Sequence, residues 1–136
     1  MADVRNNQER RGTVTIEAAL VFPILLLLTL ALVEYGWMFL KAQQTTNAAR
    51  NGARIGALAQ STTADAYAAV SSLMDTAGMS GYSVTCTPEE VGSLPPGETL
   101  KVEVTIPYAN VALLGTPFVP VPENLTASVS MAKEGS

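Results

Sequence analysis

The longest run of apolar positions lies near the amino terminus of the chain. Residues 18–33 carry no charge, and the run extends to residue 40 when Glu34 is accepted within it. At about 1.5 Å per helical residue, the longer run spans roughly 35 Å, which exceeds a hydrocarbon layer of about 30 Å. The pattern therefore predicts one transmembrane helix, and we place its bounds at residues 13–41.

A helical pattern of polar and small residues continues over residues 42–60, which contain no proline. We expect the helix to leave the bilayer and to continue to about Leu58. Four residues recur at spacings of four, three and four and therefore share one polar stripe. They are Gln43, Asn47, Arg50 and Arg54.

The opposite side of this segment consists of small residues, among which Ala48, Gly52 and Gly56 form a run with a spacing of four. Small side chains let another backbone approach closely. Because glycine costs a helix about 1 kcal/mol relative to alanine, we expect tight packing here. The partner is either the carboxy-terminal part of the same chain or the helix of a neighbouring subunit, and both contacts are compatible with the pattern.

The second half of the chain predicts one short helix and three strands. Helical spacing over residues 63–77 places Tyr67, Val70, Met74 and Ala77 on one face, and Gly78 and Gly81 end the helix. Apolar and polar residues alternate over 82–87, 99–106 and 125–132, as in half-buried strands. We therefore predict an α+β fold in which the helices cover one face of a three-stranded antiparallel sheet.

The segment 107–123 is too rich in proline for a regular element, yet it carries six large apolar residues. Long loops of this kind are usually functional or unstructured, and the apolar content argues against disorder. We expect the segment to fold back as a lid on the core; the alternative is an assembly surface.

Composition excludes several classes of function. Residues 57–136 carry two basic and eight acidic side chains, which is a poor match for nucleic acid. The chain has no histidine and one cysteine, Cys86, and it lacks the spacing of a metal site, a phosphate-binding loop or a nucleophile elbow. We expect no enzyme activity, no cofactor, no metal and no small-molecule substrate.

Glu17 stands at the start of the apolar run, where a carboxylate within the bilayer costs about 2.5–3.5 kcal/mol. Cleavage after Gly12 would leave the free α-amine of Thr13 one helical turn before this acid, or within reach of the same acid on an adjacent subunit. The alternative is an uncleaved chain in which Glu17 meets Arg10 or Arg11 at the cytoplasmic interface.

Two further residues interrupt the apolar helix. Pro23 has no amide hydrogen, so it frees the carbonyl of Ala19 and loosens the helix locally; the alternative is a proline that is merely tolerated in a membrane helix. Glu34 lies near the outer end of the span, two turns before Lys41 on the same side. It is either a second functional acid or a partly solvated residue at the end of the span.

A short basic leader that ends in Gly12, followed by an apolar helix with Glu17 as its fifth residue, resembles a type IV prepilin. Further matches resemble the TadE-like family of tight-adherence (Tad/Flp-type) pilus systems. They are Glu17, Pro23, Glu34-Tyr35-Gly36 and the segment Asn47 to Arg54, which includes Arg50. These motif matches cover about residues 10–58, and the strand-rich remainder agrees only in general character.

The resemblance implies a minor pilin or pseudopilin, with a pilin-like fold, that contributes to pilus assembly and adhesion. Its partners would be the membrane, other pilins or pseudopilins, the pilus assembly machinery and a prepilin peptidase. We expect a single-pass protein of the bacterial inner membrane with its amino terminus in the cytoplasm. Residues 1–12 would be the cytoplasmic leader, 13–41 the span, 42–60 the helical continuation and 61–136 an extracytoplasmic head.

Two other interpretations remain open at this point. One is a generic single-pass envelope protein whose head binds an unrelated partner. The other is a secreted protein that signal peptidase releases, since Arg5, Arg10 and Arg11 precede a leucine-rich segment as in a secretory signal.

Overall fold

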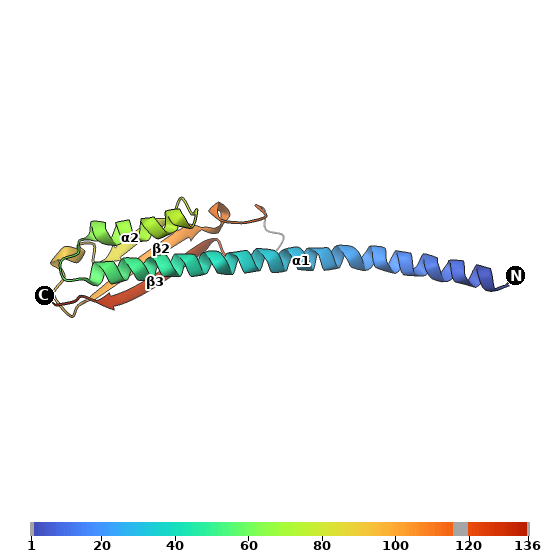
Figure 1. The fold of residues 1–136 in the computed structure, drawn as a ribbon, viewed down its shortest axis with the longest axis horizontal. Coiled ribbons are helices and arrows are strands. Elements are labelled where there is room, and N and C mark those ends of the chain that lie inside the picture. The colour runs from blue at the N-terminus through green and yellow to red at the C-terminus, as the bar shows by residue number, and fades with distance from the viewer. Residues whose placement is uncertain (1, 116–119, 136) are drawn as a thin grey trace.

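The computed structural model describes residues 2–115 and 120–135, with side chains described from residue 13 onward. One helix dominates the molecule: α1 (Ala2–Ala57) has 56 residues, and it carries the rest of the chain as a small head on its carboxy-terminal half. The two termini lie at opposite ends of the molecule (Figure 1). The predicted continuation of the apolar helix to about Leu58 is confirmed to within one residue.

The second helix, α2 (Thr63–Thr76), begins at a capping box. The hydroxyl of Thr62 accepts a hydrogen bond from the amide of Asp65, and the Asp65 carboxylate accepts one from the amide of Thr62 at 2.8 Å. The hydroxyl of Thr62 also donates to this carboxylate at 2.7 Å. The two bonds that the carboxylate accepts, from the amide and from the hydroxyl of Thr62, lower the pKa of Asp65. Beyond the helix, Gly78 and Gly81 adopt positive φ angles of 65° and 74°. Glycine takes this conformation readily, and both residues follow the end of the helix as predicted.

The predicted face of α2 is buried along its middle and exposed at one edge. Val70 and Met74 are fully buried, as expected, but Tyr67 is 37% exposed and Ala66 is buried in its place. Residues 66, 70 and 74 follow one row at a spacing of four, and Tyr67 lies one position away at the edge of that row. Tyr67 therefore covers the edge of the buried face of α2 and not its centre.

The sheet has the order β1 (Ser83–Thr87), β2 (Thr99–Pro107) and β3 (Asn124–Ala132), with both pairs antiparallel. β2 is central and alternates strictly, with Leu100, Val102, Val104 and Ile106 all fully buried. The α+β fold with a three-stranded antiparallel sheet is confirmed.

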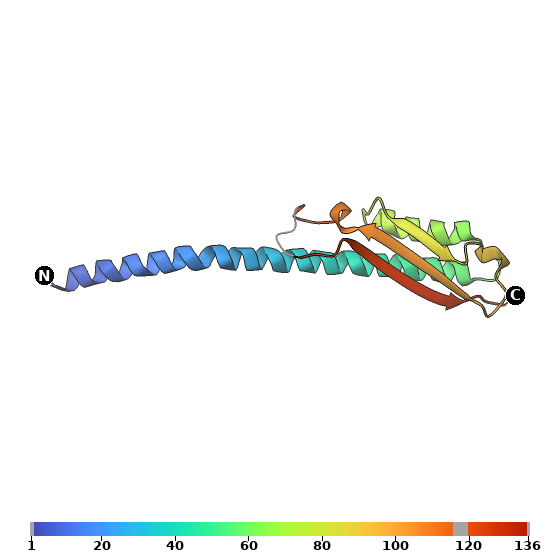
Figure 2. The ribbon, with the colours of Figure 1, turned by 180° about the vertical axis from the view of Figure 1, so that it is seen from behind.

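The core lies between one face of this sheet and the two helices. Figure 2 shows the sheet from its outer side, with α1 and α2 behind it. The outer face is polar, and its rows across the strands include Ser83, Thr105 and Thr126. Cys86 is 4% exposed and belongs to the core.

The chain between β2 and β3, residues 108–123, is called the return loop below. It begins with the 3-10 turn η2 (Tyr108–Asn110), and both Tyr108 and Val111 are buried in the core. Residues 116–119 of the predicted lid lie outside the described residues. The described part folds back onto the core and onto α1, as the lid prediction stated (Figure 1).

Candidate functional site on the long helix

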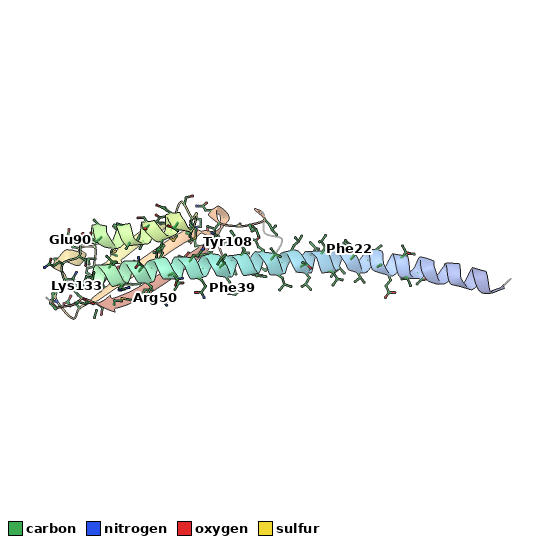
Figure 3. The ribbon with its side chains drawn as sticks, viewed as in Figure 1. Phe22, Phe39, Arg50, Glu90, Tyr108 and Lys133 are labelled. Carbon is green, nitrogen blue, oxygen red and sulfur yellow. The ribbon has the colours of Figure 1, made fainter. Side chains whose placement is uncertain are left out.

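The first part of α1 has no cover from the head. Every described side chain from Thr13 to Thr29 is exposed, including Phe22 at 66% and Leu25 at 54% (Figure 3). Within the described part of the chain, α1 from Thr13 onward is the one helix long and apolar enough to cross a membrane. An apolar rod with nothing packed on it fits a single-pass membrane anchor.

Glu17 lies on this uncovered segment. Its side chain is exposed, and within the described part of the chain no hydrogen bond or ion pair reaches it. α1 continues as a helix through Gly12 and Thr13 and through Pro23. The predicted processing site and the predicted point of flexibility therefore both lie within regular helix.

Glu34 lies in a different environment from the partly solvated one expected at the end of the span. It is 2% exposed, and its carboxylate accepts hydrogen bonds from the hydroxyl of Tyr108 and from the amides of Leu113 and Leu114, the amides at 3.3 and 3.0 Å. Burial raises the pKa of Tyr108, and the hydrogen bond to Glu34 and the charge of this carboxylate raise it further. The acid is therefore held by the head of its own chain.

The two aromatic residues near Glu34 hold the same loop. The Tyr35 hydroxyl donates to the carbonyl of Pro120 at 2.9 Å, and Trp37 Nε1 donates to the carbonyl of Val111 at 2.6 Å. Together with Glu34 they bind the return loop along about one turn of α1. Gly36, between the two aromatics, has no atom within 4 Å of the position that a Cβ would take.

Lys41 joins α1 to the end of α2 and makes no ion pair with Glu34. Its side chain is 7% exposed, and Nζ donates to the carbonyl of Ala77 at 2.9 Å. The ammonium also lies 4.8 Å from the centre of the Trp37 ring, within cation–π range. The Lys41 ammonium therefore offsets the partial negative charge on the free carbonyls at the carboxy-terminal end of α2.

The small-residue face of α1 packs against the head of the same chain. Ala48, Gly52 and Gly56 are all buried. A Cβ on Gly52 would lie 2.4 Å from Val70 Cγ2, and a Cβ on Gly56 would lie 2.6 Å from Leu100 Cδ2. A side chain at either position would therefore force a shift in α2 or in the side chains of Val70 or Leu100.

The opposite stripe faces outward. Gln43, Asn47, Arg50 and Arg54 are all exposed, and Figure 3 shows Arg50 on the side of α1 away from α2. Within the described residues, the only ion pair is Lys101–Glu103 at 2.9 Å, on the exposed face of the sheet. The two arginines therefore remain available to an external partner.

A buried lysine, which the sequence analysis did not single out, closes the far end of α1. Lys133 is 4% exposed, and its Nζ donates to the carbonyls of Gly56 and Ser61 at 3.1 and 3.3 Å (Figure 3). Ser61 also donates from its hydroxyl to Gly56 at 2.7 Å. These groups satisfy carbonyls that the helix end would otherwise leave unpaired.

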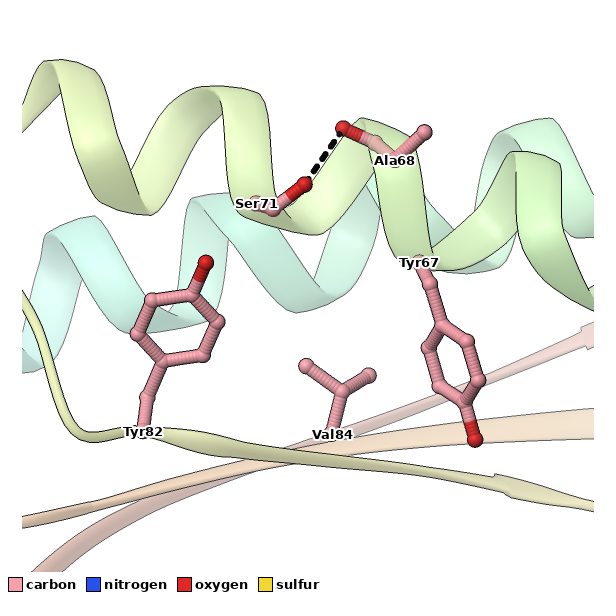
Figure 4. A pocket seen from close by; sticks show the side chains of 5 residues that line it. All are labelled: Tyr67, Ala68, Ser71, Tyr82 and Val84. Carbon is pink, nitrogen blue, oxygen red and sulfur yellow. Dashed lines mark hydrogen bonds between the residues drawn. The ribbon is translucent and has the colours of Figure 1, made fainter.

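A surface groove of about 410 Å³ lies between α2 and β1. Figure 4 shows its lining: two tyrosines flank Val84, and Ser71 donates to the carbonyl of Ala68 at 3.1 Å. The lining residues are Tyr67, Ala68, Ser71, Tyr82 and Val84. The Tyr82 hydroxyl donates a hydrogen bond to Asp75 at 3.3 Å. None of the candidate site residues predicted from the sequence lines the groove.

The comparisons with known proteins bear on the helix. Residues 12–54 match the model of a family described as TadE-like protein. This part of the long helix resembles TadE-like proteins. The match covers every motif position singled out above, from Gly12 to Arg54. The comparison with curated proteins and that with solved structures each found no match.

Three contact residues were missed at the sequence level: Trp37, Tyr108 and Lys133. Tyr108 and the two leucine amides come from a proline-rich loop with no periodicity, so no spacing links them to Glu34. The sequence does contain a signal for Trp37, because this residue stands three positions after the acid Glu34 and therefore on the same helical face. Among the described side chains, those of residues 13–115 and 120–135, no three histidine, cysteine, aspartate or glutamate residues gather as metal ligands.

Proposed function

We propose that this TadE-like chain is a minor pilin or pseudopilin, anchored in the bacterial inner membrane, that contributes to assembly of a Tad-type pilus. The observation that carries the proposal is the exposed Glu17 on an apolar segment that the head leaves uncovered. A carboxylate in lipid requires a cationic partner or a proton, and a neighbouring subunit's amino terminus supplies one after cleavage at Gly12. The role is structural, not enzymatic.

The span in this proposal is shorter than the expected 13–41. The head contacts α1 from Glu34 onward, and loop amides meet the Glu34 carboxylate. We therefore place the span at residues 13–33, which extend roughly 31 Å as a helix and match a hydrocarbon layer of about 30 Å. Residues 1–12 then lie in the cytoplasm, and the head lies on the other side of the membrane.

The polar stripe and the processing site have roles in the same proposal. Asn47, Arg50 and Arg54 face outward roughly 20–30 Å beyond the proposed end of the span, at about 1.5 Å per helical residue, and an adjacent subunit of the pilus system would pack there. The head of the same chain buries Ala48, Gly52 and Gly56, so these small residues fix the helix to its own head. A prepilin peptidase would cut between Gly12 and Thr13.

Mass spectrometry of the mature amino terminus tests the processing step. A start at Thr13 supports a pilin, and an intact leader indicates an uncleaved anchor. A start well beyond residue 33 indicates a secreted protein and contradicts the proposal.

Substitution of Glu17 tests the assembly step. Glu17→Ala and Glu17→Gln are expected to insert normally, because both remove the cost of the charge in lipid, but to lose surface pili. Leu25→Ala is the matched control, since it shortens an exposed side chain in the same segment and is expected to leave the pilus yield unchanged. Normal pilus yield in both Glu17 variants would show that the acid has no pairing role.

A further inference from the structure

The return loop carries an apolar surface at the level where the uncovered part of α1 ends. Leu113 is 46% exposed, and Leu32 and Val33 on α1 are 66% and 48% exposed. Both leucine amides at 113 and 114 bond to Glu34, which follows Val33 directly. The sequence 107–122 contains no charged residue.

This apolar loop is held in place and cannot swing away from α1 as a free segment. Tyr108, Leu113 and Leu114 bond to Glu34, and Trp37 bonds to the carbonyl of Val111. Residues 108–114 are thus fixed to one turn of α1 at the proposed outer edge of the bilayer. Leu113 therefore has a defined depth relative to the span.

Glu34 also pairs backbone amides of the loop, and unpaired amides would disfavour a loop at the membrane boundary. Irregular backbone enters the membrane boundary only when its amide and carbonyl groups have partners. The carboxylate supplies the acceptor for the amides of Leu113 and Leu114, and Trp37 supplies the donor for the carbonyl of Val111. Leu113 is the large apolar side chain that this segment leaves exposed.

We propose that residues 111–115 make a second contact with the membrane, in which Leu113 inserts into the outer leaflet beside the end of α1. The partner is the phospholipid bilayer, because the apolar surface of the loop continues that of the span without an intervening charge. The inference rests on the proposed membrane anchor. It adds that the head, in addition to the helix, binds lipid, and that Glu34 holds the binding segment.

Depth-dependent quenching of tryptophan fluorescence tests the contact. Trp37 is the only tryptophan in the chain, so Trp37→Phe gives a silent background for single tryptophans at chosen positions. The full chain is reconstituted into phosphatidylcholine vesicles whose acyl chains carry bromine either near the headgroup or near the bilayer centre. Leu113→Trp is expected to shift its emission to the blue and to lose intensity with the shallow bromines.

Two further positions separate failure of the contact from failure of the anchor. Phe22→Trp is expected to lose intensity with the deep bromines, and Leu73→Trp, on the exposed side of α2, with neither. An unquenched Phe22→Trp would show that the span is not inserted. A quenched Phe22→Trp with an unquenched Leu113→Trp overturns the loop contact alone; if the Leu113→Trp emission is still blue-shifted, the loop is covered by protein.

A second measurement keeps Trp37 and its bond to Val111. A nitroxide label at Leu113→Cys, in a Cys86→Ala chain, reports the relative access of oxygen and of a water-soluble nickel complex. Greater access of oxygen supports insertion of the loop. Greater access of the nickel complex, as expected for the same label at Leu73→Cys, overturns it.

Discussion

The hydroxyl of Tyr108 donates a hydrogen bond to the carboxylate of Glu34, and these residues stand 74 positions apart in the chain. Each of these two residues is only 2% exposed to solvent. The acid at the outer end of the apolar helix thus serves as an acceptor for its own head, whereas Glu17 at the inner end is left for a partner. Two carboxylates on one helix therefore have separate tasks.

Removing either side of the Glu34–Tyr108 contact is expected to destabilise the head. Glu34→Ala leaves one hydroxyl and two amides without their acceptor, and at about 1–3 kcal/mol for each buried unpaired group the loss reaches at least about 3 kcal/mol. Tyr108→Phe removes one donor from a charged acceptor and costs about 1.5–3 kcal/mol. Thermal unfolding of the full chain in detergent micelles, followed by circular dichroism, measures both.

The double variant gives the control for this pair. Because the two groups bond directly, the sum of the single effects should exceed the effect of the double variant by more than about 0.5 kcal/mol. Strict additivity would show that the two groups do not interact in the folded protein.

Alkaline pH is expected to weaken the head through Tyr108. The pKa of Tyr108 is raised in the folded state from its ordinary value of 10.0, so above pH 10 the unfolded chain releases this proton first. The contribution is complete below pH 10 and is lost as the pH rises from 10 towards the folded-state pKa. The free energy of unfolding of the unsubstituted chain, minus that of Tyr108→Phe, should therefore fall above pH 10 and stay constant between pH 7 and 9. A constant difference up to pH 12 would contradict the assignment.

Two glycines of α1 should respond in opposite directions to the same substitution. Gly52→Ala places a Cβ 2.4 Å from Val70 Cγ2 and 3.2 Å from the carbonyl oxygen of Ala66, which cannot move without α2. Overpacking of this kind costs up to about 3 kcal/mol, more than the roughly 1 kcal/mol that alanine adds to helix stability. Gly36→Ala meets no atom within 4 Å and should gain about that 1 kcal/mol. Equal effects on the unfolding temperature would disprove the close approach at Gly52.

Lys133→Met should destabilise the far end of α1 while keeping most of the side-chain volume. The carbonyl of Ser61 loses its donor, and a buried unpaired acceptor costs about 1–3 kcal/mol. The carbonyl of Gly56 loses one of its two donors and keeps the hydroxyl of Ser61. Lys101→Met is the control, because Lys101 forms only an exposed ion pair worth at most about 1 kcal/mol. Thermal unfolding that is no more sensitive to Lys133→Met than to Lys101→Met would count against the cap.

Periodicity predicted most of the fold because each regular element has one apolar face. The alternation along β2 placed Leu100, Val102, Val104 and Ile106 correctly in the core, and the helical spacing of Val70 and Met74 did the same for α2. The burial of Ala66 was not predicted, because a small apolar residue adds little to the periodic pattern, and Tyr67 lies at the edge of the same face.

The candidate site was predicted only in part. The Gly12–Glu17 spacing and the small residues of α1 are local features of one helix, so the sequence displays them directly. The environment of Glu34 was missed because its donors come from a loop whose path depends on the packing of the whole head. Lys133 was missed for the same reason, since its acceptors belong to the end of a helix about 75 residues earlier in the chain.

The head binds α1 at both ends of the helical segment that it covers. Glu34 makes the contact at one end and Lys133 at the other. The overlap from residue 34 to residue 57 is roughly 35 Å long, and β3 runs beside the helix over much of it (Figure 2). A force that pulls along the axis of α1 therefore acts parallel to the contact surface between α1 and the head. All contacts bear this shear load together, so they do not break one after another.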